Sequence, residues 1–142
     1  MDVYLSINNR EQVIKLPVTP DEFQMQSGMS NDTYETISQG EIKLIGMSKL
    51  KAITLQSFFP AKDYPFLRDR SYFGWEYVEM IEAWMARRIP IRLIITGTPV
   101  NMACSIEAFD YGPKDGSGDI YYTLTLSEFK FIQLTQRSVP GA

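Results

Sequence analysis

The sequence predicts a mainly β protein with one flanking α-helix, arranged as an antiparallel β-barrel or sandwich. Three observations lead to this fold class. Residues 3–7 alternate apolar and polar side chains, the last third of the chain carries three further strand-like segments, and only residues 74–88 show helical spacing of apolar side chains. The connections between neighbouring segments are short and turn-like, which favours hairpins and therefore antiparallel pairing.

The strands expected in the first half of the chain cover residues 3–7, 12–16, 34–38, 41–45 and 52–58. The first two are joined by a polar turn, and the next pair flanks Gln39-Gly40, so each pair is expected to form a hairpin. Pro17 and Pro20 interrupt strand pairing between these hairpins. We expect a short helical turn at residues 21–23, capped by Thr19.

The predicted helix over residues 74–88 has a clear apolar stripe and a clear end. The stripe consists of Trp75, Val78, Ile81, Trp84 and Met85. Pro90 ends the helix. The three glutamates at positions 76, 79 and 82 are interpreted as a solvated face, because no histidine or second carboxylate cluster accompanies them to form a metal site.

The strands expected in the last third cover residues 91–97, 100–110 and 119–126. The connector over residues 111–118 is rich in glycine and is interpreted as a hairpin tip, since it does not join a strand to a helix as a phosphate-binding loop does. The apolar phase of the last strand changes after Ser127. This shift predicts a β-bulge or bend around Glu128.

Residues 58–73 combine aromatic side chains, two prolines and several charges in an irregular order. Proline disfavours a helix there, and the irregular order disfavours a strand. Two interpretations remain open for this loop. It is either pinned to its own core or inserted into a neighbouring subunit, because exposed aromatic side chains usually mark a surface that something else covers.

Composition excludes several classes of function. The chain has 142 residues, enough for one domain, and we place that domain at residues 1–134 with residues 135–142 as a tail or the start of a linker. The net charge of −3 argues against a general nucleic-acid binder. A membrane span is not expected, since the sequence has no apolar run of the necessary length, roughly 18 residues.

Catalysis is not expected either. The sequence contains no histidine, so it lacks the commonest general base and metal ligand, and the single cysteine, Cys104, lies in a predicted strand. We therefore expect no enzymatic activity, no catalytic residues, no metal and no cofactor.

Three segments resemble a known family. They are Leu16-Pro-Val-Thr-Pro-Asp-Glu-Phe23, Ile91-Arg-Leu-Ile-Ile-Thr-Gly-Thr-Pro-Val-Asn-Met102 and Gly118-Asp-Ile-Tyr-Tyr-Thr-Leu-Thr-Leu-Ser-Glu-Phe-Lys130. They are similar to the N-terminal domain of LysM-bearing tail baseplate proteins of PBSX-type prophages, contractile phages and phage-tail-like bacteriocins. The resemblance implies a fold related to the phage tail tube. No LysM module follows in these residues, which leaves open whether it is trimmed away or lacking in this member.

The resemblance also implies a role in assembly. Such a chain would form a ring, as a homohexamer, in the baseplate of a contractile tail or injection system. The ring would join the central hub and spike to the tail tube, as a tube initiator or hub adaptor. It would be found in the virion or phage-like particle after assembly in the bacterial host cytoplasm, with no membrane partner, and DNA would pass through its lumen without specific binding.

Within such a ring, we assign two sets of residues by hypothesis. The expected subunit interface contains Phe58, Phe59, Tyr64, Phe66, Tyr72, Gly116 and Gly118. The expected channel-facing residues are Thr123, Thr125 and Ser127, whose uncharged face would not hold phosphate. An alternative is an accessory module that binds peptidoglycan in the cell wall, with Tyr64, Tyr72 and Trp75 stacking on sugar rings.

Overall fold

The computed structural model describes residues 1–132, which fold into nine strands and one helix. The strands are β1 (Val3–Ile7), β2 (Gln12–Lys15), β3 (Met25–Gln26), β4 (Asp32–Thr36), β5 (Gly40–Leu44), β6 (Ala52–Phe59), β7 (Ile91–Ile95), β8 (Asn101–Pro113) and β9 (Ile120–Glu128), and the helix is α1 (Trp75–Arg87). The prediction of a mainly β fold with one helix is confirmed for these residues. The expected domain end at residue 134 and the tail over residues 135–142 lie outside them.

Seven strands form one antiparallel sheet in the order β2-β1-β7-β8-β9-β6-β3, and β4 pairs only with β5. Of the two expected arrangements, barrel or sandwich, the closed barrel is wrong, because within residues 1–132 β2 and β3 are the unpaired ends of this sheet. Both end strands are short, with four and two residues. Pro17, directly after Leu16, also lacks the N–H that further pairing of β2 would need.

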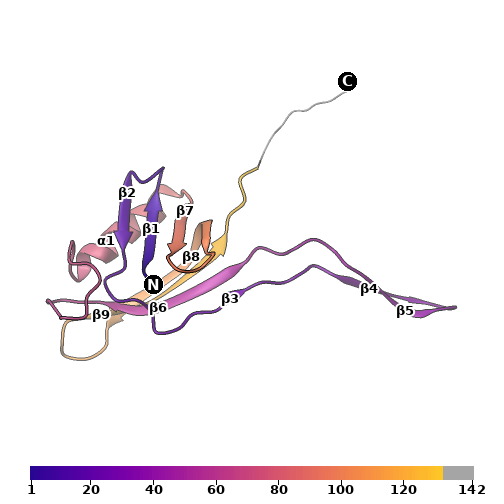
Figure 1. Ribbon diagram of the computed structural model, residues 1–142, viewed down its shortest axis with the longest axis horizontal. Coiled ribbons are helices and arrows are strands. Elements are labelled where there is room, and N and C mark those ends of the chain that lie inside the picture. The colour runs from indigo at the N-terminus through magenta and orange to yellow at the C-terminus, as the bar shows by residue number, and fades with distance from the viewer. Residues whose placement is uncertain (133–142) are drawn as a thin grey trace, which may run out of the picture.

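The sheet bends so that its two parts cross each other. In Figure 1, β1, β2 and β7 stand upright and lie across the direction of β6 and β9. Strand β8 belongs to both parts, since it pairs with β7 near its start and with β9 along most of its length.

A β-bulge lies in β8, where Glu107 is the extra residue between Ile106 and Ala108. The prediction of a bulge or bend around Glu128 is therefore wrong in its location. β9 pairs regularly with β6 from Ile120 to Ser127, and the change of apolar phase marks the end of the strand. A bulge bends its own strand and increases local twist, which suits the strand that crosses between the two parts of the sheet.

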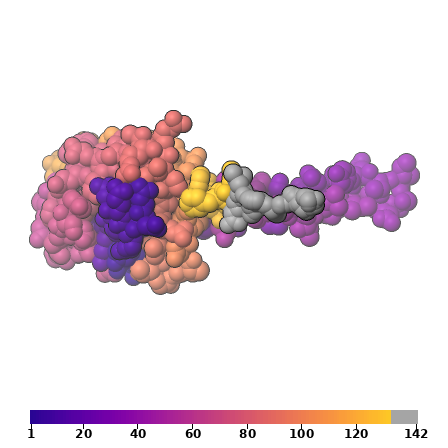
Figure 2. Space-filling model, turned by 90° about the horizontal axis from the view of Figure 1, so that it is seen from above, coloured from indigo at the N-terminus to yellow at the C-terminus, as the bar shows by residue number. Residues whose placement is uncertain are grey.

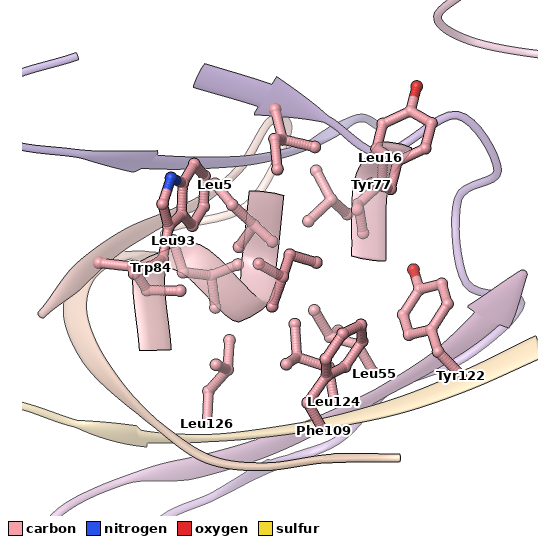
Figure 3. Packing of buried hydrophobic residues seen from close by; sticks show 14 of the residues in the cluster. Leu5, Leu16, Leu55, Tyr77, Trp84, Leu93, Phe109, Tyr122, Leu124 and Leu126 are labelled. Carbon is pink, nitrogen blue, oxygen red and sulfur yellow. The ribbon is translucent and has the colours of Figure 1, made fainter. Parts of the chain in front are cut away.

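Helix α1 packs into the hollow of the bent sheet and closes the core. Its buried side chains are Tyr77, Val78, Ile81 and Trp84. Figure 3 shows Leu55, Leu124 and Phe109 rising from β6, β9 and β8 toward Leu5, Leu93 and Tyr77 on the opposite side. The buried indole of Trp84 donates a hydrogen bond to Gln12 Oε1 at 2.7 Å, so this polar group is satisfied inside the core.

One position of the expected helical stripe is wrong. Trp75 lies in the first turn with 52% of its surface exposed, whereas Tyr77 is fully buried. Tyr77 and Trp84 are seven residues apart and so lie on one face, two turns apart. The helical turn expected at residues 21–23 is also absent from the structure. Thr19 does not cap a helix but donates its hydroxyl to the carbonyl of Met1.

A long two-stranded extension leaves the body between β3 and β6. We define the arm as residues 27–51, which contain β4 and β5 and the predicted Gln39-Gly40 turn. Its two branches are held by backbone hydrogen bonds such as Ser30 N to Met47 O at 2.8 Å. Figure 2 shows the arm projecting far out from a rounded body.

Candidate assembly surfaces

The arm is a two-stranded ribbon that packs on no core of its own, and it exposes large apolar side chains. They are Met29, Tyr34, Ile37, Leu44, Ile45, Met47 and Leu50. Ile37, in the turn at the tip, is fully exposed. An isolated two-stranded ribbon is marginal in water, and a monomeric protein rarely exposes so much contiguous apolar surface. The arm therefore has the features of a surface that another molecule covers.

An aromatic cluster occupies the end of the body opposite the arm. We define the aromatic pole as Phe58, Tyr64, Phe66 and Tyr121. The rings of Tyr64 and Phe66 stack with centroids 5.1 Å apart, and Phe58 lies 5.3 Å from Tyr121. Lys62 Nζ lies 5.6 Å from the Tyr64 ring, and Lys114 Nζ lies 5.3 Å from the Tyr121 ring. Both lysines are placed for cation–π contacts.

Asp119 anchors the aromatic pole to the sheet. Its carboxylate is buried and accepts hydrogen bonds from Ala61 N at 2.8 Å and from the Tyr64 hydroxyl at 2.7 Å. This hydrogen bond to Asp119 is the main reason that the pKa of Tyr64 is raised to about 12. These two hydrogen bonds attach the loop over residues 60–73 to the residue that directly precedes β9.

The expected interface residues separate into two groups. Phe58, Tyr64 and Phe66 come together at the aromatic pole, while Gly118 lies beside the same loop, where an added Cβ atom would be 3.5 Å from Ala61 Cβ. Gly116 lies in the exposed tip between β8 and β9 with open space around it. These positions are accessible to a neighbour, and whether a neighbour contacts them stays a prediction.

Phe59 and Tyr72 belong to the second group. Phe59 has 0% of its surface exposed and stacks between Tyr77 and Tyr122, with ring centroids at 4.8 and 4.2 Å. Its side chain therefore has no surface to offer a neighbouring subunit in this fold. Tyr72 is half-buried and packs edge-on against Tyr77 at 5.7 Å. The interpretation that the loop is pinned to its own core therefore holds for Phe59 and Tyr72. Other side chains such as Phe66 remain exposed, and their insertion into a neighbouring subunit stays a prediction.

The expected channel-facing residues share one face of the sheet. Thr123, Thr125 and Ser127 alternate along β9 with the buried Tyr122, Leu124 and Leu126. They lie on the face opposite α1. Their partners across the neighbouring strands on that face are Gln56, Thr54, Ala52, Asp110, Ala108 and Ser105. Apart from Asp110, these side chains carry no charge, and Glu107, the extra residue of the bulge, places a second carboxylate beside them by accepting a hydrogen bond from Ser105 Oγ. The face thus holds mainly uncharged side chains, and we call it the neutral sheet face.

An open groove of about 680 Å³ lies where this neutral face meets the aromatic pole. Phe58 and Tyr121 line its apolar part, and Asp21, Asp110 and Lys114 line its polar part. Two carboxylates against one ammonium make the groove unfavourable for phosphate-rich ligands.

The three aromatic residues considered for sugar stacking do not form a single platform. Tyr64 is stacked on Phe66, Tyr72 packs against the core, and Trp75 contacts Tyr111 edge-on at 6.0 Å on the side of α1. A sugar-binding platform usually presents a flat ring with hydrogen-bonding groups beside it, and these residues face different surroundings. The structure therefore offers no specific observation that favours the carbohydrate-binding alternative.

The part of the chain that the structure describes has few side chains arranged for metal binding or nucleophilic chemistry. Within residues 1–132, no three His, Cys, Asp or Glu side chains gather as metal ligands would. Cys104 is buried, and burial raises the pKa of its thiol to about 11, which keeps it protonated. The one helix of these residues is too short and too polar to cross a lipid bilayer.

The arm is the candidate surface that sequence reasoning did not recognise. The Gln39-Gly40 turn correctly predicted its hairpin, but the apolar residues at 45, 47 and 50 were not linked to exposure. A signal was present, because these residues lie among Gly, Ser and Lys, without the strict period that core strands show.

Comparisons with known proteins agree with the fold. No family model matches the chain. A relative described as uncharacterized protein YqbP of Bacillus subtilis (strain 168) is 35% identical over 127 residues, which is 87% of this chain. The chain spans 58% of the length of that relative.

Two similar solved structures come from gene transfer agent (GTA) particles. One is a chain in the virion of the native particle, with a TM-score of 0.57 and 13% identity. The other is a chain in the tail of the empty particle, which has C6 symmetry, with a TM-score of 0.57 and 15% identity. In both cases the likeness covers 92% of each chain. The fold of this protein is therefore similar to that of a GTA tail protein: mainly β, with one helix and an open antiparallel sheet.

Proposed function

We propose that this protein is a structural component of a phage-like contractile tail, in which copies of it form a baseplate ring that joins the hub and spike to the tail tube. The observation that carries the proposal is the likeness of its fold, over 92% of both chains, to a chain in the tail of a GTA particle. The proposed role is structural rather than catalytic.

The arm supports a role in assembly. Its exposed apolar side chains have no partner among the described residues, so covering them with another protein chain would remove unfavourable contact with water. A catalytic or small-molecule function would leave this surface unexplained. Assembly with further copies or with tube and hub proteins explains it directly.

A ring of six copies is consistent with the C6 symmetry of the GTA tail and with the open sheet of this chain. Strands β2 and β3 each leave one edge without a partner. Such edges are available for pairing with a neighbouring chain, and a head-to-tail contact repeated by a sixfold rotation closes on itself.

The neutral sheet face gives the ring a suitable inner wall. Thr123, Thr125 and Ser127 present hydroxyl groups without positive charge. Proteins hold DNA mainly through cationic contacts with phosphate, so a wall of this kind lets DNA pass without binding it. We therefore propose that this face lines the channel of the particle.

Copy number in purified particles tests the proposal. Quantitative mass spectrometry of the tails that contain this chain is expected to give six copies per tail, or a small multiple of six, against a far larger number of tube subunits. A copy number equal to that of the tube subunits would contradict the baseplate role. Absence of the chain from tails would contradict the proposal as a whole.

The peptidoglycan alternative has its own test. Purified chain is mixed with insoluble peptidoglycan and sedimented, with a LysM protein as the positive control. We expect the chain to stay in the supernatant. Sedimentation with the cell-wall material would replace the structural proposal with a binding role.

A further inference from the structure

The arm and the body expose apolar surface at opposite ends of the molecule. In Figure 1 the tip of the arm, with β4 and β5, lies at one end, while the loop over residues 60–73 and the connector between β8 and β9 lie at the other. On the body, apart from Met1 at the start of the chain, exposed large apolar side chains are found in three places. They are the aromatic pole with Phe66, the α1 side with Trp75 and Tyr111, and the end of the described chain with Phe129, Phe131 and Ile132.

Charge distinguishes between these surfaces as partners for the arm. Glu35 and Glu41 are directly opposite each other in the β4–β5 ribbon, so two carboxylates share one face of the tip. Like charges at such a pair destabilise a ribbon unless a cation lies between or above them. Neither carboxylate takes part in an ion pair among the described residues, and Lys43 donates instead to Thr33. The tip therefore fits a surface that is apolar and carries available ammonium groups.

The aromatic pole meets this requirement. Lys62 and Lys114 lie over its rings and have no carboxylate partner within the described residues. The carboxylates nearby are already engaged: Asp63 with Arg70, Asp115 with Ser117, and Asp119 with Tyr64. Asp21 and Asp110 line the groove beside Lys114 without forming an ion pair with it, so Lys62 and Lys114 are the ammonium groups that a docked arm can reach.

The other two apolar surfaces fit less well. Trp75 and Tyr111 are next to the acidic face of α1, where the Tyr111 hydroxyl donates to Glu82 Oε2 at 2.8 Å. That face would repel Glu35 and Glu41. Phe129, Phe131 and Ile132 flank one lysine, Lys130, and this end of the described chain lies on the side of the body from which the arm leaves (Figure 1), so it does not face the end opposite the arm.

We propose that the arm tip of one copy docks on the aromatic pole of another copy of the same chain. Ile37 would pack on Phe66, and Glu35 and Glu41 would pair with Lys62 and Lys114. The inference rests on the proposed function, since it names the partner surface used for assembly. The arm tip and the aromatic pole lie at opposite ends of the molecule (Figure 1). The contact is therefore head-to-tail and can repeat from copy to copy.

Site-specific cross-linking tests the contact. Because the native Cys104 is buried, new cysteines at exposed positions are the reactive ones. Ile37→Cys in one copy and Phe66→Cys in another are co-expressed with the tail proteins, and the particles are oxidised. The matched control replaces Phe66→Cys by Trp75→Cys, since the two aromatic side chains are exposed to 55% and 52%.

We expect an intermolecular disulfide between positions 37 and 66, at a yield on the order of tenfold above the control pair. A higher yield with Trp75→Cys, or no disulfide in particles that contain the chain, would overturn the docking site while leaving the ring proposal intact. Failure of the chain to enter particles or to associate with itself would contradict the ring proposal and the docking site together.

Charge reversal gives a second, independent readout. Glu35→Lys with Glu41→Lys, or Lys62→Glu with Lys114→Glu, is expected to reduce incorporation into particles by on the order of tenfold, since like charges then face each other. Combining the four substitutions in one chain restores the pairing and should restore incorporation. Equal losses in the combined variant, with circular dichroism showing an intact fold, would refute the pairing.

Discussion

At the scale of single residues, burial decides which aromatic side chains hold the fold and which are available for assembly. Phe59 and Phe66 are seven positions apart in one loop region, yet the first is fully buried and the second is exposed to 55%. Phe59 fills the space between Tyr77 and Tyr122, whereas Phe66 caps Tyr64 from outside. The same residue type therefore has two different roles within this segment.

Replacing Phe59 by alanine should lower the free energy of unfolding by about 3–5 kcal/mol, because it leaves a cavity between two aromatic rings. Urea denaturation followed by circular dichroism measures this loss. Phe66→Ala is the matched control and should cost less than about 1 kcal/mol, as expected of a surface substitution. Equal losses for the two variants would show that Phe59 is not packed between these rings.

The ion pair between Asp2 and Arg68 predicts that the folding stability of the chain depends on pH. Arg68 Nε donates to Asp2 Oδ1 at 2.7 Å, and this hydrogen bond is the main cause that lowers the pKa of Asp2 from its ordinary value of 3.8. A pKa lowered by folding contributes stability above the ordinary pKa, and this contribution is lost as the pH falls through the folded value.

The urea midpoint of the native chain should therefore fall as the pH is lowered from about 5 to 3, and Asp2→Asn should flatten part of that fall. Asp32→Asn, on the exposed arm, serves as the control. A native chain and an Asp2→Asn variant with parallel pH profiles would contradict the role of this pair.

At the scale of elements, the two branches of the arm approach each other so closely at one position that a side chain there would disrupt their pairing. A Cβ atom at Gly46 would lie 1.8 Å from the carbonyl oxygen of Ser30, so the two branches approach each other too closely there for any side chain. Gly28 is a contrasting position on the same arm, since a Cβ there would meet only Lys49 Cδ at 3.8 Å.

Gly46→Ala should separate the two branches, with faster hydrogen exchange at Ser30 N and Lys49 N, and with reduced assembly. The thermal midpoint of the body should change by no more than about 2 °C, since the arm has no contact with the core beyond its base. Gly28→Ala should leave both exchange and assembly unchanged. If Gly46→Ala behaved in the same way, the close approach of the two branches would be refuted.

Periodicity predicted the secondary structure well, and long-range geometry poorly. Strands such as β1 and the helix α1 were predictable because one face of each is buried and the apolar residues repeat with the period of the element. The bulge at Glu107 was assigned to the wrong strand, because a change of apolar phase shows where a face changes but not which strand carries the extra residue.

Sequence reasoning could also not assign Phe59 to the core or Trp75 to the surface. Both positions depend on the side from which a neighbouring element packs, and a one-dimensional pattern does not contain that information. The sequence placed Phe58, Tyr64 and Phe66 in one aromatic loop but did not predict that their rings come together. The hydrogen bond from Tyr64 to Asp119 was not predicted either, since it joins residues 55 positions apart in the chain.

At the scale of the whole molecule, the structure combines a self-sufficient body with an arm that has no core of its own. The bent sheet and α1 enclose the hydrophobic core, while the arm, the aromatic pole and the neutral sheet face lie outside it. The likeness to a chain of the GTA tail extends over 92% of this chain. If further copies cover the arm, as we propose, their binding adds to the stability of the folded chain.

The most direct test of the central proposal is cryo-electron microscopy of the tail particle that contains this chain. We expect six copies in a ring around the channel at the baseplate end of the tube, with Thr123, Thr125 and Ser127 facing the lumen and each arm in contact with another copy. A peripheral position away from the channel, or an arrangement without sixfold symmetry, would contradict the proposed role of joining hub to tube.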